Sequence, residues 1–150
     1  MTFDAAAAKA LIEAVKSHAQ TLGVFDRVTI HAPENAPGSG LSCWFTLGDV
    51  VPVQSSGLGA VSIEVTLTAH IVTSMLQKPM GAVEWNMLGA VSLLMNAYAG
   101  DFNLGGLVRD VNIFAGLKAD LGYLDFQEKS FRIAEITIPL VVNDAWVEAP

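Results

Sequence analysis

The sequence predicts an α+β fold, a mostly antiparallel sheet with both helices packed on one face. Hydrophobic residues recur at helical spacing in two separate segments, and they alternate at strand spacing in the segments between and after them. Short connections favour antiparallel pairing of the strands. The chain has 150 residues, the size of an ordinary domain, so we expect a single domain over 1–150.

The chain is expected to open with a helix and a strand. Behind Asp4, apolar residues recur at three- and four-residue steps, and Gly23 supplies a left-handed stop. The next stretch, Val24–Ala32, is rich in β-forming residues and predicts a first strand. Proline and glycine then make Pro33–Gly40 a loop.

Two further strands are expected before the second helix. Alternating apolar residues over Leu41–Leu47 predict a strand with one apolar face. The segment Gly48–Gly59 is rich in glycine and serine and predicts a long connection or a flexible hairpin tip. The clearest alternation in the chain predicts a long third strand over Val61–Ile71.

A second helix and a short strand are expected next. Pro79 opens the helix, whose apolar residues keep helical spacing up to Gly100. After a turn at Gly105 and Gly106, three residues indicate a short strand: Leu107, Val111 and Ile113.

The chain is expected to close on a hairpin. Its first strand is Tyr123–Gln127, its turn lies at Glu128 and Lys129, and its second strand has an apolar face over Ala134–Val142. Pro139 cannot donate a ladder hydrogen bond, so we expect it at an edge or beside a bulge. The element order is therefore helix, three strands, helix, and two or three strands.

The composition favours an assembly subunit. Hydrophobic residues make up 52% and charged residues 15% of the chain, whereas soluble domains have about 25% charged residues. This excludes intrinsic disorder and fits poorly with a solitary monomer. The net charge of −7 lacks the positive footprint of a protein that grips nucleic acid. No apolar run reaches the roughly 18 residues of a membrane span, and the first residues do not read as a signal peptide.

Residues that could carry chemistry form no recognisable motif. His18, His31 and His70 stand at no metal-ligand spacing, and the glycine pairs lack the rest of a nucleotide signature. The single cysteine, Cys43, lies on an apolar strand face, which indicates a buried structural thiol. We therefore expect no catalytic residue, cofactor or metal. The remaining acidic side chains are expected to be solvated: Asp101, Asp110, Asp120 and Asp125.

The end of the chain has a distinctive form. Gly122-Tyr123-Leu124 is followed by Phe131-Arg132, by Pro139 and by Asn143-Asp144-Ala145-Trp146. In these segments and in its element order, the chain resembles the tail terminator, or tail completion, proteins of long-tailed bacteriophages. Those proteins show an N-terminal helix, a middle hairpin of long strands, an apolar second helix and a closing strand with an aromatic-Arg pair before a proline.

The resemblance implies a structural virion protein that is not an enzyme. Six copies would form a ring that caps the tail tube, ends its polymerisation and provides the surface for head joining. The implied partners are further copies of the chain, the tail tube protein and a head-tail connector or stopper protein, while DNA passes through the channel without specific binding. The protein would assemble in the cytoplasm of the bacterial host and reside in the tail or neck of the virion.

The expected contacts lie in the loops 33–40 and 48–59, at the sheet edge and in the last strand. Asp49, Glu64 and Asp110 would be lumenal carboxylates that let DNA slide. Trp146 would anchor in a neighbour's pocket or fold back on its own core. The candidate interface residues are Asp49, Val50, Val51, Pro52, Gln54, Glu64, Arg132, Pro139, Asp144 and Trp146.

Two alternatives remain open at this point. The apolar segment Pro79–Ala99 invites comparison with a hotdog-type thioesterase or ligand-binding domain, in which a sheet wraps a long helix and tryptophans and methionines line a pocket. Against it, Glu84 is the helix's only candidate carboxylate, with no nearby histidine or Gly-Gly turn to build an oxyanion site. Another neck component, a connector or stopper subunit, is the second alternative.

Overall fold

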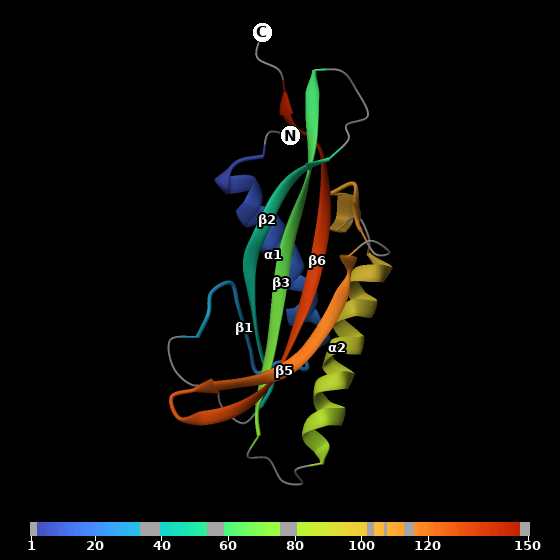
Figure 1. The fold of residues 1–150 in the computed structure, drawn as a ribbon. Coiled ribbons are helices and arrows are strands. Elements are labelled where there is room, and N and C mark those ends of the chain that lie inside the picture. The colour runs from blue at the N-terminus through green and yellow to red at the C-terminus, as the bar shows by residue number, and fades with distance from the viewer. Residues whose placement is uncertain are drawn as a thin grey trace.

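Two helices and a six-stranded sheet make up the structure, a computed structural model that describes residues 3–33, 40–53, 59–75, 81–101, 104–106, 108–112 and 116–147 (Figure 1). The fold is α+β, as the sequence predicts. In chain order the elements are α1 (Ala5–Leu22), β1 (Arg27–Thr29), β2 (Ser42–Val53), β3 (Ala60–Ser74), α2 (Ala82–Gly100), the 3-10 turn η1 (Leu104–Gly106), β4 (Asp110–Val111), β5 (Lys118–Phe126) and β6 (Lys129–Val147).

The sheet is built around β3 and β6. These two strands pair antiparallel from Ala60 opposite Val147 to Ser74 opposite Phe131. The strand order is β1-β2-β3-β6-β4, and β5 pairs with the first part of β6 as the other strand of a hairpin. The strands β4 and β5 therefore share one side of β6, and β2 lies on the far side of β3.

The first strand departs from the expectation in two ways. It covers only Arg27–Thr29 rather than Val24–Ala32, and it pairs with β2 in parallel rather than antiparallel. A parallel pair needs a connection of about a dozen residues or more. The segment from Ile30 to Leu41 has that length, so the rule that short connections give antiparallel pairs does not apply here.

The second strand is longer than expected, because β2 continues through Gly48 to Val53 instead of ending at Leu47. A register shift between Leu47 and Val50 interrupts the alternation, and this bulge is what makes the sequence look like a loop. A Cβ atom at Gly48 would lie 3.1 Å from the carbonyl oxygen of Thr66, which favours glycine at the bulge. The rest of the expected connection, 54–58, lies outside the described residues.

A second register shift, between Val61 and Ile63 on β3, corrects the expected face of Val61. Val61 is exposed and Ser62 is buried, whereas the five apolar residues from Ile63 to Ile71 all point into the core as predicted. The extra residues are on β6, where Asp144 has a φ of 50° and its N–H donates to Ser62 Oγ at 3.1 Å.

Pro139 lies within the central strand β6 and not at an outer edge of the sheet, yet its position satisfies the same constraint. Its carbonyl accepts a hydrogen bond from the Asn112 N–H at 2.8 Å, so the backbone of Pro139 faces the β4 and β5 side. On that side β4 pairs no further than Leu140 and β5 begins opposite Thr137. The proline occupies the gap between these strands, where no ladder donor is needed.

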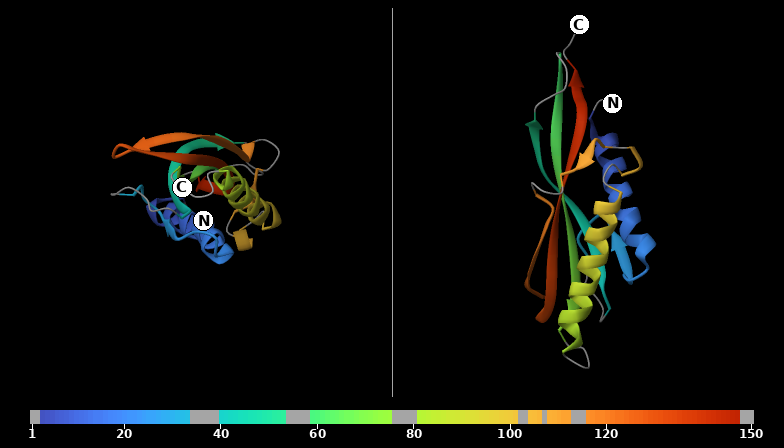
Figure 2. Two further views of the ribbon diagram at one scale, coloured as in Figure 1. Left: turned by 90° about the horizontal axis from the view of Figure 1, so that it is seen from below. Right: turned by 90° about the vertical axis from the view of Figure 1, so that its right-hand side faces the viewer.

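Both helices pack on one face of the sheet, called here the helix face (Figure 2). As predicted, α1 begins behind Asp4, whose Oδ1 accepts from the Ala7 N–H, and ends at the left-handed Gly23. In α2, the predicted apolar residues from Val83 to Tyr98 are buried; Pro79 lies outside the described residues. The predicted apolar face of β6, from Ala134 to Val142, completes the main core.

The closing hairpin curls over the opposite face of the sheet, called here the helix-free face (Figure 2). A second, smaller core forms there from Trp44, Val72, Phe131 and Ile133, with Leu124 and Phe126 of β5 packed against it. The hairpin turn lies at Gln127 and Glu128, one residue before its expected place, and both residues have positive φ, the geometry of a tight two-residue turn.

The short strand predicted around Leu107, Val111 and Ile113 is present as β4, which covers only Asp110–Val111. Leu107 and Ile113 lie outside the described residues.

We expect Ile136→Ala to lower the free energy of unfolding by about 2–5 kcal/mol, because it leaves a cavity in the main core. Ile136 is fully buried at the centre of β6. Glu135→Ala, one position away and exposed, is the matched control and should cost at most about 1 kcal/mol. Urea unfolding of both variants measures the difference, and equal losses would contradict the assigned faces of β6.

Candidate assembly interface

The strands extend beyond the helices at one end of the molecule (Figure 2). We call this end the distal ribbon; it consists of Gly48–Val53 of β2, Ala60–Glu64 of β3 and Val141–Trp146 of β6. It is anchored to α1 by one backbone hydrogen bond, from the Phe3 N–H to the Ala145 carbonyl at 2.9 Å. The ribbon is therefore continuous with the main core at its base and solvated at its tip.

The outer edge of β2 is open along most of its length. Within the described segments, β1 pairs only with Ser42–Trp44, which leaves Phe45–Val53 with a strand neighbour on one side only. Such an edge presents backbone donors and acceptors to another chain. Its side chains are apolar and exposed: Leu47 is 45%, Val50 36% and Val51 50% accessible.

The residues expected at the interface fall into three groups. Asp49, Val50, Val51 and Pro52 are exposed on the β2 edge, and Trp146 is 40% exposed opposite Val61 at the ribbon tip. Glu64 and Asp144 are half-buried, and Gln54 lies outside the described residues. Pro139 is buried and the Arg132 side chain is only 11% exposed, so the interface proposed below is built from the exposed members.

Arg132 fixes the closing hairpin to α2. Its Nε donates to Glu84 Oε1 at 2.6 Å, its Nη1 donates to the Gly122 carbonyl at 2.8 Å, and the guanidinium lies 4.4 Å from the centre of the Tyr123 ring. A planar cation with several donors suits this combined task. Glu84, the carboxylate considered for a hotdog-type site, is therefore occupied as the partner of this arginine.

The carboxylates considered in the sequence each bind a separate partner. Glu64 accepts from Asn112 Nδ2 at 3.0 Å, Asp110 lies 3.8 Å from Arg109, Asp120 lies 3.6 Å from Lys118, and Asp125 accepts from Ser130. The strand register places Glu64, Asp110 and Asp120 on the helix-free face, together with Glu135. Acidic groups thus gather on that face of the sheet, a grouping that linear spacing does not reveal.

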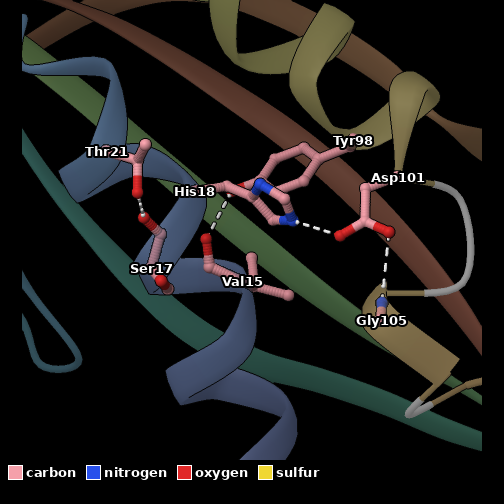
Figure 3. Close-up of polar contacts among 7 residues, drawn as sticks. All are labelled: Val15, Ser17, His18, Thr21, Tyr98, Asp101 and Gly105. Atoms are coloured by element: carbon pink, nitrogen blue, oxygen red, sulfur yellow. Dashed lines mark hydrogen bonds and ion pairs between the residues drawn. The ribbon is translucent and has the colours of Figure 1, made fainter.

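A polar bridge joins α1 to the end of α2 (Figure 3). The His18 ring donates from Nε2 to Asp101 Oδ2 at 3.0 Å, and Asp101 Oδ1 accepts from the Gly105 N–H. The Tyr98 hydroxyl donates to the Val15 carbonyl at 3.0 Å, and its ring meets the His18 ring edge to face. Burial raises the pKa of the Tyr98 hydroxyl well above its ordinary value, so this group stays protonated. The arrangement binds the two helices together.

Sequence reasoning did not single out the exposed apolar residues outside the β2 edge. Besides Val61, the exposed large hydrophobic residues are Trp85, Leu88, Leu93, Leu121 and Tyr123. Helical spacing identifies the inner face of α2, but it does not reveal that the outer face is apolar and uncovered. In the described segments no three histidine, cysteine or acidic residues gather as a metal site. Neither described helix has the length and apolar character needed to cross a bilayer.

We expect His70 to make the protein less stable as the pH falls. The imidazole stacks on Trp44 and is hydrogen-bonded to Thr46, and its burial lowers its pKa below the ordinary 6.5, although Glu135 opposes the shift. The unfolded chain then binds the proton more tightly, so this contribution to stability is complete above pH 6.5 and is lost as the pH falls through the lowered value. His70→Gln should flatten the dependence of the unfolding free energy on pH in that window, and parallel curves for the two proteins would contradict the assignment.

We expect Cys43 to be inert in the native protein. The thiol is buried in the main core, and this burial raises its pKa to about 12, so the reactive thiolate is absent at neutral pH. A colourimetric thiol reagent should modify less than a tenth of the protein in the time that modifies all of it in denaturant. Rapid modification of the folded chain would show that the core opens at β2.

Comparisons with known proteins leave the family open. No protein family matches the sequence, and no curated protein is similar to it. Among solved structures, the chain is similar to a chain in the virion of a native gene transfer agent particle, with 14% sequence identity and a TM-score of 0.37. That match covers 92% of this chain and 98% of the other.

Proposed function

We propose that the chain is a structural virion protein of the tail terminator type, a subunit of a six-membered ring that caps a phage tail tube and provides the surface for head joining. The observation that carries the proposal is the distal ribbon, whose open edge and apolar tip extend beyond the helices (Figure 2). The element order expected from the resemblance, with a long middle hairpin and a closing strand through Phe131-Arg132 and Pro139, supports it.

The ribbon has the chemistry of a contact surface. Leu47, Val50 and Val51 line its edge, while Val61 and Trp146 face solvent side by side in the register at its tip. Soluble monomers rarely leave apolar residues gathered beside an unpaired strand, because such an edge recruits other chains. A subunit that is covered by neighbours in its assembly removes this surface from water. In the proposal the edge meets the next copy in the ring, and the tip meets an axial partner, the tail tube or the connector.

The helix-free face suits a channel that passes DNA. Glu64, Asp110, Asp120 and Glu135 share this face, and the chain as a whole carries a net charge of −7. Carboxylates repel the phosphate backbone and avoid the slow release that cationic contacts produce. In the proposed ring this face lines the channel and the helices lie outside.

The proposal is tested by purified protein mixed with growing tail tubes. Negative-stain images should show six-fold rings at tube ends, and added protein should shorten and narrow the distribution of tube lengths. A ring that binds the head connector but leaves tube length unchanged would instead indicate another neck component. A stable dimer or tetramer that does not bind tube ends or connectors would overturn the proposal.

Val61→Lys should weaken binding to the axial partner at least tenfold. Burying an unpaired ammonium group at the ribbon tip costs several kcal/mol, and about 1.4 kcal/mol already corresponds to a factor of ten. Tyr123→Lys places the same charge on another exposed residue, on the closing hairpin, and should bind as the unmodified protein does. Sedimentation with tail tubes and with connector complexes measures both, and unchanged binding of Val61→Lys to both partners would contradict the role of the tip.

A further inference from the structure

The outward side of α2 is apolar although no part of this chain covers it. Trp85 is 73%, Leu88 48% and Leu93 46% exposed, while the opposite side of the same helix fills the main core. The only charged side chain in the helix is Glu84. A helix that is hydrophobic all round is normally buried on all sides. The outward side of α2 therefore has the character of an interface.

A hollow of about 270 Å³ lies beside this side of the helix. Trp85, Gly89 and Leu93 follow one another at four-residue spacing along its helical wall, and Val24 and Leu41 form part of the facing wall. A Cβ atom at Gly89 would touch nothing within 4 Å, so the glycine leaves this space open rather than relieving a clash. The hollow can receive apolar side chains from another molecule.

The electrostatics of this side favour a partner with the same charge as the chain. Glu84 is neutralised by Arg132 at 2.6 Å, so the helix offers no unpaired charge to an approaching surface. With a net charge of −7, two copies of the chain repel each other over most orientations. Repulsion is weakest where uncharged apolar surfaces meet, and the outward side of α2 is one such surface.

We propose that the outward side of α2 binds the open β2 edge of a second copy of this chain. That edge supplies Leu47, Val50 and Val51 and has Asp49 as its single charged residue between Leu47 and Val53. In Figure 1, β2 runs along the left-hand side of the sheet and α2 along the right-hand side. A contact between different surfaces on opposite sides repeats in one direction and closes into a ring.

This inference rests on the ring proposed above and specifies which surfaces join its subunits. It differs from α2 pairing with α2, which would join identical surfaces and stop at a dimer. The two arrangements place different residues next to each other, so they are distinguished by directed cross-linking.

The test uses single cysteines on exposed positions, with native Cys43 buried and inert. Copies carrying Leu93→Cys are mixed with copies carrying Val51→Cys and oxidised mildly, and disulfide-linked species are resolved on a non-reducing gel. The mixture should give a mixed dimer at least tenfold more abundant than either self-linked dimer, and a chain carrying both substitutions should give a ladder of linked species. Lys9→Cys, on the exposed side of α1, is the matched control and should not link to Val51→Cys.

The possible outcomes separate this inference from the proposed function. Dimers of Leu93→Cys alone would establish α2-to-α2 pairing and overturn the inference. Rings at tube ends without the mixed cross-link, and undiminished in a Leu93→Glu variant, would overturn it while leaving the terminator function intact. A mixed cross-link with no binding to tubes or connectors would support the contact between copies and overturn the terminator function.

Discussion

The pairing of β3 with β6 is the constraint on which the other features of the structure depend. Its register turns Ile63 to Ile71 and Ala134 to Val142 toward the helices, and a slip of one residue would turn both sets to the opposite face. The helix-free face consequently receives the polar and acidic side chains of the same strands. Both cores, the gap that accommodates Pro139 and the base of the distal ribbon are arranged along this one ladder.

The charges of the chain are largely satisfied within it, whereas its apolar surfaces are not. Arg132 holds Glu84, Lys118 lies beside Asp120, and His18 binds Asp101. By contrast, the β2 edge and the outward side of α2 expose large hydrophobic residues in two separate regions. Hydrophobic contacts of this kind supply affinity, and the absence of unpaired charge on both surfaces removes the main cost of bringing acidic copies together.

Periodicity predicted the elements whose side chains alternate regularly, and it failed where the backbone departs from regularity. Both helices, the core face of β3 and the apolar face of β6 were predicted, because burial on one side imposes a simple repeat. The extension of β2 to Val53 was missed, since the bulge at Gly48 breaks the repeat, and the parallel pairing of β1 depends on a long-range choice that local pattern does not encode. The Arg132 contacts and the apolar outside of α2 arise from tertiary packing, so only the exposed β2 residues of the candidate interface were accessible from sequence.

The β3 and β6 strands lie far apart in the sequence, and this separation has a consequence for when the surfaces exist. Local elements such as α2 and the closing hairpin form quickly, whereas pairing distant strands requires closing a long loop and is intrinsically slow. The distal ribbon requires that late pairing, because its three strands come from β2, β3 and β6. A newly synthesised chain therefore acquires its partner-binding end only in the last step of folding, and incomplete molecules are kept out of the assembly by kinetics rather than by a separate checking device.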